Sequence, residues 1–252
     1  MYSYPFADFN KINEKLNELQ IESYDKLAMI HDFIGGQFLD NEKNIMSGPK
    51  SAIVSIGGIA TEVENKKLHM LGKETTIEEL KESFNKSIGM SSFMSYLNPK
   101  NKSLDEIAET TLNLNHNSVL HQINIGILLT GISIGVEHEF STQRDIIHLS
   151  RITVAKTKAQ QSPCLVLPDE KYLKVYQEVL KSTNDILKDN NIDDNEIRNL
   201  LFPTAKASGL IINGSLRNIM KLIALKDAGG KENEFIRSLE NIENTLSYLI
   251  GN

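Results

Sequence analysis

Three apolar runs along the chain predict the strands of a central sheet. Ile123–Ile132 is the longest run and is rich in Ile and Leu. Ser51–Glu62 and Ser208–Asn213 are the other two, and Gly57-Gly58 marks a bulge or bend within Ser51–Glu62. Short apolar runs bounded by turn residues are typical of buried strands. The pattern therefore predicts a sheet whose strands come from distant parts of the chain.

Apolar residues at helical spacing predict helices between and after these strands. Thr76-Ile-Glu-Glu79 matches a capping box, and Ser103 and Ser215 are typical N-cap residues. The predicted helices run from Thr76 towards Tyr96, then over Leu104–Leu114, Val136–Ser150, Asp169–Asn190, Asn195–Phe202, Leu216–Lys226 and Glu232–Ile250. For Asp169–Asn190 we expect a buried stripe made of Leu173, Val175, Tyr176, Val179, Leu180, Ile186 and Leu187.

Residues 1–48 predict a helical N-terminal extension. Apolar residues recur at helical spacing within Phe9–Leu19 and Leu27–Ile34, and the polar segment Asn41–Lys50 predicts a linker. In the rest of the chain, long helical segments separate the strands. We therefore expect an α+β fold, in which residues 49–252 form a single domain with a central sheet flanked by long helices and the N-terminal helices pack on it.

The composition and charge of the chain argue against several classes of function. The 252 residues carry a net charge of −6, which disfavours binding to nucleic acid or to a membrane surface. No apolar run reaches the length of a membrane span, and the N-terminus has no signal-peptide pattern. The single cysteine, Cys164, excludes an internal disulfide, and its apolar neighbours favour packing over nucleophilic catalysis. We expect a cytoplasmic protein.

The stretch Leu112–Lys158 holds four of the six histidines. His116 and His121 are five residues apart, and His138 and His148 are ten apart. Neither spacing stacks two ligands on one turn of a helix, so we expect no metal site here.

Charged side chains around the predicted strands leave two interpretations. Glu137 and Glu139 face apart on a helix, which argues against shared acid–base chemistry. Two basic clusters follow predicted strands: Arg144, Arg151, Lys156 and Lys158 after one, and Arg217, Lys221 and Lys226 after another. These clusters either meet around a phosphate or form solvated helix faces, and the sequence leaves both possibilities open.

Two segments of the chain resemble the flavin-dependent thymidylate synthases. His116-Asn-Ser118-Val-Leu-His121-Gln122, followed by a strand and a helix, resembles the family's His-x-Ser/Thr-x-x-Glu-His opening. Pro203–Ser208, Asn213–Lys226 and Glu234 resemble the family's Leu-Pro turn, its Asn-Leu-Arg helix and its later Glu-Ile-Arg. Counting without a gap places the family's Arg-His-Arg on Thr142, Gln143 and Arg144.

The resemblance implies a reductive methylation of dUMP or a related pyrimidine nucleotide, in which FAD, NADPH and methylenetetrahydrofolate take part, by a homotetramer. It implies FAD-binding roles for Ser118, Thr142, Gln143, Arg144, Ser215, Arg217 and Lys221. It implies nucleotide-binding roles for Glu139, Arg151, Lys156 and Lys226 and assigns no catalytic residue. Flavin and nucleotide phosphates both bind guanidinium and ammonium groups, which fits the arginines and lysines of this set.

Several positions depart from the family pattern. Thr142 and Gln143 replace the first Arg and the His, Ile147 replaces a Ser, and His121 replaces a Glu. The helices and strands are thus kept better than the charges, as happens when a fold persists while its site is remodelled. Two hypotheses follow: a flavin-dependent nucleotide methylase, or a catalytically degenerate relative that acts as a partner subunit or a nucleotide-binding protein.

Overall fold

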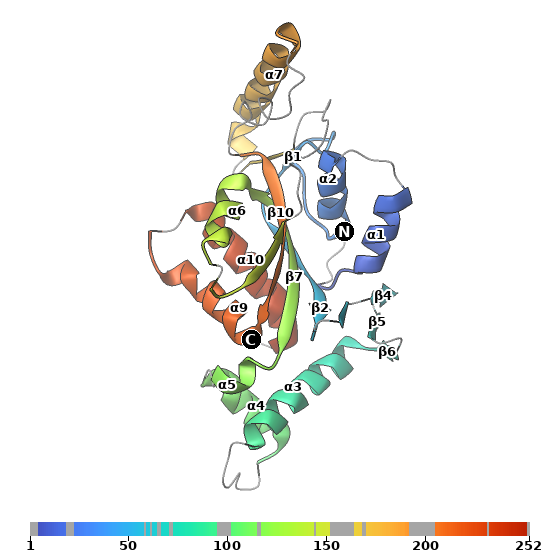
Figure 1. Ribbon diagram of the computed structural model, residues 1–252, viewed down its shortest axis with the longest axis vertical. Coiled ribbons are helices and arrows are strands. Elements are labelled where there is room, and N and C mark those ends of the chain that lie inside the picture. The colour runs from blue at the N-terminus through green and yellow to red at the C-terminus, as the bar shows by residue number, and fades with distance from the viewer. Residues whose placement is uncertain are drawn as a thin grey trace.

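A five-stranded antiparallel sheet lies at the centre of the computed structural model (Figure 1). The structure describes residues 5–18, 23–57, 59–60, 62–64, 67–70, 73–94, 102–114, 117–143, 145–151, 164–167, 170–191, 205–230 and 232–250. In spatial order the strands are β3 (Ile59–Ala60), β2 (Lys50–Ile56), β7 (Asn124–Ser133), β10 (Ala207–Ser215) and β8 (His148–Arg151). The three predicted strands are β2, β7 and β10, and the expected α+β fold with a central sheet is confirmed.

The central strand β7 is buried throughout after its first residue, Asn124. Helices cover both faces of the sheet, and a strand buried on both faces needs a continuous apolar run rather than an alternating one. The strand continues through Gly131, which has a φ of +70°. A Cβ atom at this position would lie 2.2 Å from the carbonyl oxygen of Gly48, so only glycine fits.

Helices from both ends of the chain cover the two faces (Figure 1). One face carries α6 (Ile134–Ser141), α9 (Leu216–Ile223), the short η2 (Ala224–Asp227) and α10 (Asn233–Ile250), and the other carries α1 (Phe9–Glu18) and α2 (Ser23–Phe33). Alternate residues of β2 and β7 face opposite layers. Ile53 and Ile127 belong to the larger cluster, which contains α9 and α10, whereas Val54 and Leu128 pack with α1 and α2.

The remaining helices lie at the two ends of the molecule (Figure 1). At one end are α3 (Ile77–Phe93), α4 (Leu104–Asn113) and α5 (Asn117–Leu120), and at the other are η1 (Glu170–Tyr172) and α7 (Leu173–Asp189). A small antiparallel sheet contains β4 (Glu62–Glu64), β5 (Lys67–Met70) and β6 (Lys73–Thr75), and β1 (Ile45–Met46) pairs in parallel with β9 (Leu165–Val166). Among the helices that the structure describes, none combines the length and apolar character needed to cross a membrane.

Three predicted helix caps are confirmed. The Thr76 side chain accepts the backbone N–H of Glu79, and Ser103 accepts that of Glu106, each in a complete capping box. Ser215 accepts the backbone N–H of Asn218 at the start of α9. These contacts involve only neighbours in sequence, which is why the local pattern is sufficient to predict them.

The helix predicted over Val136–Ser150 is wrong in its second half. α6 ends at Ser141, and His148–Arg151 is strand β8, which pairs with β10. Ile147 is buried, His148 is exposed and Leu149 is half-buried, an alternation that belongs to a strand. Pairing with β10 therefore overrides the helical spacing of the apolar residues in this segment.

The buried stripe predicted for Asp169–Asn190 is also wrong, although the helix itself forms. Leu187 is buried, but Val175, Val179 and Ile186 are 55%, 41% and 50% exposed. Leu173, Tyr176 and Leu180 are only half-buried. α7 projects beyond the end of the sheet (Figure 1), so the sheet does not cover this apolar face.

The segment predicted as a linker, Asn41–Lys50, contains β1 and the first residue of β2. The short strands β1, β4, β5, β6, β8 and β9 were not predicted. The bend predicted at Gly57-Gly58 separates β2 from β3, and Gly57 has a φ of +63°. The predicted helix Asn195–Phe202 lies outside the described residues, and so does Tyr96.

The N-terminal segment packs against the sheet. The backbone N–H of Ile53 donates to the carbonyl of Pro5, and the N–H of Ala7 donates to the carbonyl of Ile53. His31 of α2 bonds Thr130 of β7, with 2.8 Å between Nδ1 and Oγ1. The division between an extension at residues 1–48 and a domain at residues 49–252 stays a prediction.

Candidate functional site

Four strand ends converge on one pocket. β7 begins at Asn124, β8 begins at His148, β2 ends at Ile56 and β10 ends at Ser215, and in an antiparallel sheet these ends share one edge. The pocket has a volume of about 440 Å³, within the usual range of about 300–1,000 Å³ for small-molecule sites. Its lining residues are Ser55, Gly57, His121, Asn124, Ile125, Asp145, Ile146, Ile147, His148, Asn213, Gly214, Ser215 and Asn218.

Neutral polar side chains dominate this lining. Asn124, Asn213 and Asn218 offer amides, and Ser55 and Ser215 offer hydroxyls. Amides and hydroxyls both donate and accept hydrogen bonds, as the edges of a nucleobase and the hydroxyls of a sugar require. The pocket is therefore equipped to bind an uncharged polar ligand group by hydrogen bonds.

His121 joins Ser215 to Arg217 at the rim of the pocket. Its Nδ1 lies 3.1 Å from Ser215 Oγ, and its Nε2 lies 3.3 Å from Arg217 Nη1. A guanidinium can only donate, so Nε2 of His121 must accept and Nδ1 must carry the proton. Ser215 Oγ then accepts both the imidazole N–H and the backbone N–H of Asn218, the latter at 3.3 Å.

Arg217 is only partly satisfied in this arrangement. Its side chain is half-buried, and its Nε atom is buried with no hydrogen-bond partner in the described part of the chain. A buried donor without an acceptor is costly. The Nη1 contact with His121 leaves other N–H groups at the end of the guanidinium for an acceptor that a ligand would bring.

The structure brings together only some of the residues predicted to bind FAD. Ser215 lines the pocket and Arg217 contacts it through His121, whereas Ser118 on α5 and Lys221 on α9 are exposed and do not line it. Arg144 lies outside the described residues.

Thr142 and Gln143 directly follow α6, and neither lines the pocket. Thr142 Oγ1 donates to the carbonyl of Glu139 at 2.7 Å, and Gln143 Nε2 donates to Thr142 Oγ1 at 2.9 Å. Ile147, at the family's Ser position, is 2% exposed and belongs to the core, although it touches the pocket. The polar groups of this segment are thus used locally.

The predicted nucleotide-binding residues are dispersed. Arg151 Nε lies 2.8 Å from Glu137 Oε1, and Arg151 Nη2 donates to Ser141 Oγ at 2.8 Å. Glu137 also accepts from Ser208 Oγ, and Lys226 pairs with Glu243. Lys156 lies outside the described residues, and Glu139 is half-buried on α6.

The two basic clusters do not meet among the described residues. Arg151 lies opposite Leu210 in the sheet, whereas Arg217 follows Ser215 at the far end of the same strand, β10. A phosphate held jointly by Arg151 and Arg217 is therefore excluded by the sheet register.

Several pocket residues were not identified from the sequence. Ser55, Asn124, Asp145 and Asn213 were given no binding role, although Asn124 and Asn213 each stand at the pocket end of an apolar strand. A polar residue at the end of a buried strand is the sequence feature that could have pointed to these positions. It identifies a pocket only when one knows which strand ends lie side by side, and the strand order of the sheet decides that.

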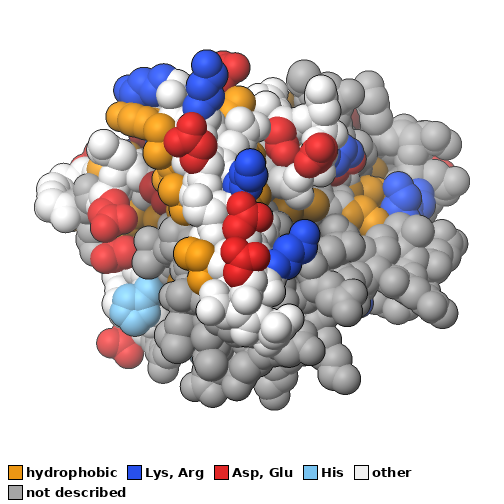
Figure 2. All heavy atoms as spheres, turned by 90° about the horizontal axis from the view of Figure 1, so that it is seen from above, with side chains coloured by type: hydrophobic (Ala, Val, Ile, Leu, Met, Phe, Trp, Pro, Cys, Tyr) orange, Lys and Arg blue, Asp and Glu red, His pale blue; other side chains and the backbone are white. Residues whose placement is uncertain are grey.

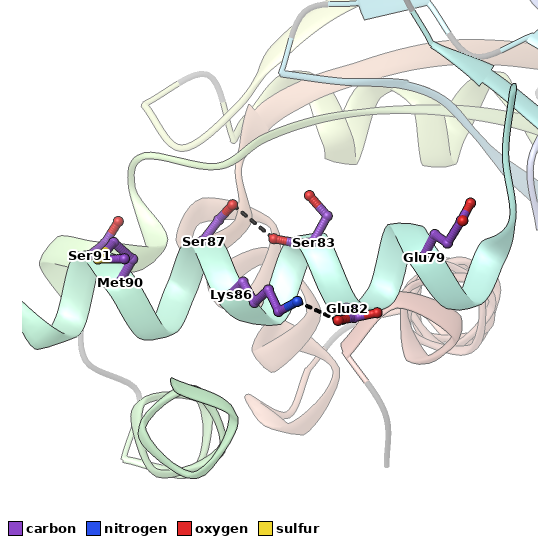
Figure 3. Close-up of a pocket in the computed structure, with 7 residues that line it drawn as sticks. All are labelled: Glu79, Glu82, Ser83, Lys86, Ser87, Met90 and Ser91. Atoms are coloured by element: carbon purple, nitrogen blue, oxygen red, sulfur yellow. Dashed lines mark hydrogen bonds and ion pairs between the residues drawn. The ribbon is translucent and has the colours of Figure 1, made fainter. Parts of the chain in front are cut away.

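A second hollow lies along α3, but it lacks the walls of a site. Its lining side chains all come from this one helix and are drawn in Figure 3. Lys86 pairs with Glu82 one turn away, and Ser87 Oγ donates to the carbonyl of Ser83 at 2.9 Å (Figure 3). The described residues also contain no group of three or more His, Cys, Asp or Glu placed to hold a metal ion.

No protein-family model and no curated protein sequence matches the chain. Solved structures do match it. Flavin-dependent thymidylate synthase ThyX from Helicobacter pylori, complexed with FAD and dUMP, has a TM-score of 0.52 at 15% identity, covering 66% of this chain and 93% of its own. The UMP/dUMP methylase PolB from Streptomyces cacaoi, bound with 5-Br dUMP, has a TM-score of 0.54 at 11% identity, covering 82% and 93%.

These likenesses span nearly the full length of both solved proteins, at identities that show the fold alone. They agree with the fold expected from the two sequence segments and with an antiparallel sheet between helical layers. The protein therefore shares the fold of the flavin-dependent thymidylate synthases and of the UMP/dUMP methylase PolB.

Proposed function

We propose that the protein is a flavin-dependent nucleotide methylase, which reductively methylates dUMP or a related pyrimidine nucleotide. FAD would be the cofactor, and NADPH and methylenetetrahydrofolate the co-substrates. One observation carries the proposal: the pocket at the convergent strand ends gathers Ser215 and, through His121, Arg217. The sequence resemblance assigns both residues to FAD binding, and the chain shares the fold of that family.

The residues around the pocket fit a phosphate-bearing aromatic ligand. Arg217, which contacts the lining residue His121, offers the N–H groups at the end of its guanidinium to a phosphate. Asn124, Asn213 and Asn218 offer amides for the edge of a ring. A bound flavin would supply the redox chemistry, and the residues of this chain would bind and orient it and the nucleotide.

We also propose that the protein is a homo-oligomer, and a tetramer by resemblance. α7 supports this proposal, because its exposed apolar side chains Val175, Val179 and Ile186 are of the kind that a partner subunit buries. α7 lies outside the pocket, so it is free to make such a contact.

A second candidate function is nucleotide binding without methylation. It is favoured by the segment that replaces the family's Arg-His-Arg, because Thr142 and Gln143 carry no charge and bond to Glu139 and to each other just after α6. Ile147 fills the core where the family has a hydroxyl. A protein of this kind would act as a partner subunit or as a nucleotide sensor.

Absorption spectroscopy and an activity assay separate these functions. For a methylase, the freshly purified protein retains a visible flavin band through gel filtration, or gains one on addition of FAD. It then converts dUMP in the presence of methylenetetrahydrofolate and NADPH. A protein that binds dUMP but neither FAD nor folate fits the second function, and a protein that binds none of these ligands contradicts both.

A further inference from the structure

We propose that His121 is a positioning residue, which holds the guanidinium of Arg217 at the pocket rim ready for a phosphate-bearing ligand. The observation is the continuous chain of contacts from Ser215 through His121 to Arg217. The inference rests on the proposed function, because it requires the pocket to accept a phosphorylated ligand. It concerns a position at which this chain departs from the family, since a Glu is expected there.

The contact restricts a flexible side chain before the ligand arrives. Arg217 is half-buried on the first turn of α9, and an arginine loses considerable rotamer freedom when it is fixed. Ser215 is itself fixed as the N-cap of α9, so the imidazole is anchored at one end and holds Arg217 at the other. Fixing a side chain in advance lowers the entropic cost of binding.

The neutral imidazole also preserves the charge of the arginine. His121 accepts from Nη1 through Nε2 and carries its proton on Nδ1, so it holds the guanidinium without neutralising it. A carboxylate at position 121 would form an ion pair with Arg217 and cancel that charge. Thr142 and Gln143 are uncharged, and no described Lys or Arg lines the pocket itself, so the site depends on Arg217, through its contact with His121, for a permanent positive charge.

The carboxylate at the pocket indicates where a phosphate would lie. Asp145, from the loop between α6 and β8, lines the pocket. A phosphate is repelled by the carboxylate of Asp145 and attracted by Arg217. We therefore assign the phosphate to the side formed by His121, Ser215 and Arg217.

Calorimetric titration with two probes, inorganic pyrophosphate and FAD, tests this assignment. His121→Phe keeps a ring but removes both hydrogen bonds, whereas His121→Gln keeps a donor and an acceptor. We expect His121→Phe to weaken pyrophosphate binding about tenfold, as for the loss of one hydrogen bond to a charged group. His121→Gln restores most of the affinity, and the melting temperature is unchanged in both because His121 is exposed.

Two further variants complete the design. His138→Phe on α6 is the matched control, because His138 is also exposed but does not line the pocket. A double-mutant cycle with Arg217→Ala separates positioning from direct contact. In the Arg217→Ala background, His121→Phe should have no further effect on binding.

Each outcome has a distinct meaning. Unchanged binding by His121→Phe, or an equal loss with and without Arg217, overturns the positioning role while the proposed function stands. If the wild type binds pyrophosphate with the expected variant effects but binds neither FAD nor dUMP, the proposed function fails and the positioning role holds. If the wild type binds neither probe, both are overturned.

Discussion

Arg217 offers a direct test of ligand binding at the scale of one side chain. Its guanidinium is half-buried and bonds only His121 among the described residues. We expect Arg217→Ala to weaken flavin retention by roughly 10- to 150-fold, since a charge-assisted contact contributes about 1.5–3 kcal/mol. The melting temperature should hardly change. Lys102→Ala, which removes an exposed lysine away from the pocket, is the control, and lost stability with intact flavin binding would make Arg217 a structural residue.

His31 links acidity to stability through a single buried ring. Nδ1 lies 2.8 Å from Thr130 Oγ1 and Nε2 lies 3.3 Å from the carbonyl of Gln37, so the neutral form fits its partners. Burial lowers the pKa of His31 from 6.5 to about 4, against the hydrogen bond to the Gln37 carbonyl and the charge of Asp32, which raise it, and together with Lys50, which lowers it. The unfolded chain thus takes up this proton at a higher pH than the folded chain does.

The folded state should therefore lose stability as the pH falls from about 6.5 to 4. The loss from His31 is roughly 3 kcal/mol, and it is absent above about pH 6.5. His31→Gln cannot titrate, so its urea midpoint should vary less over this window than that of the wild type, even if it is lower at neutral pH. Parallel pH profiles for the two proteins would show that His31 does not contribute.

At the scale of elements, the N-caps of α4 and α9 allow a matched comparison. Ser103 and Ser215 make the same kind of contact with a backbone N–H, but only Ser215 lines the pocket. Ser103→Ala and Ser215→Ala should each lower the free energy of unfolding by about 1 kcal/mol. Ser215→Ala alone should also weaken FAD binding, because it frees His121. Equal FAD affinities in the two variants would show that Ser215 acts only as a helix cap and has no role in ligand binding.

Elements that depend on neighbours in sequence were predictable, and those that depend on distant partners were not. The caps at Thr76 and Ser103 and the strands β7 and β10 follow from local patterns. The sequence pattern of β8 predicts a helix, because this segment forms a strand only through its pairing with β10. The apolar face of α7 is as regular as that of a core helix, and only its position beyond the sheet leaves it exposed.

The residues of the candidate site also differ in whether a local sequence pattern could identify them. Ser215 and Arg217 were singled out because they belong to one contiguous motif where β10 passes into α9. Ser55, Asn124 and Asp145 reach the pocket from three separate segments. Their proximity depends on strand order and register, which no single segment of the sequence determines. The set of residues that line the pocket could therefore not be predicted from the sequence.

At the α7 end of the molecule, an apolar face is left uncovered by the elements that the structure describes. Figure 2 looks at the molecule from the α7 end and shows hydrophobic side chains interspersed with lysines and acidic residues. Tyr172, Val175, Val179 and Ile186 are exposed along η1 and α7. Mixed charges around an apolar stripe suit association with an identical subunit, because neither sign accumulates at the contact.

Replacement of this stripe should therefore change the size of the particle in solution. We expect the wild type to elute as an oligomer, and Val175→Glu/Val179→Glu to shift it towards a smaller species by light scattering, because buried carboxylates without partners oppose association. Lys174→Glu, on the same helix but outside the apolar stripe, should leave the mass unchanged. A monomeric wild type, or an oligomer that survives both glutamates, would contradict a role for α7 in assembly. If FAD binding is lost together with the oligomer while the monomer remains folded, the site requires residues of a second subunit.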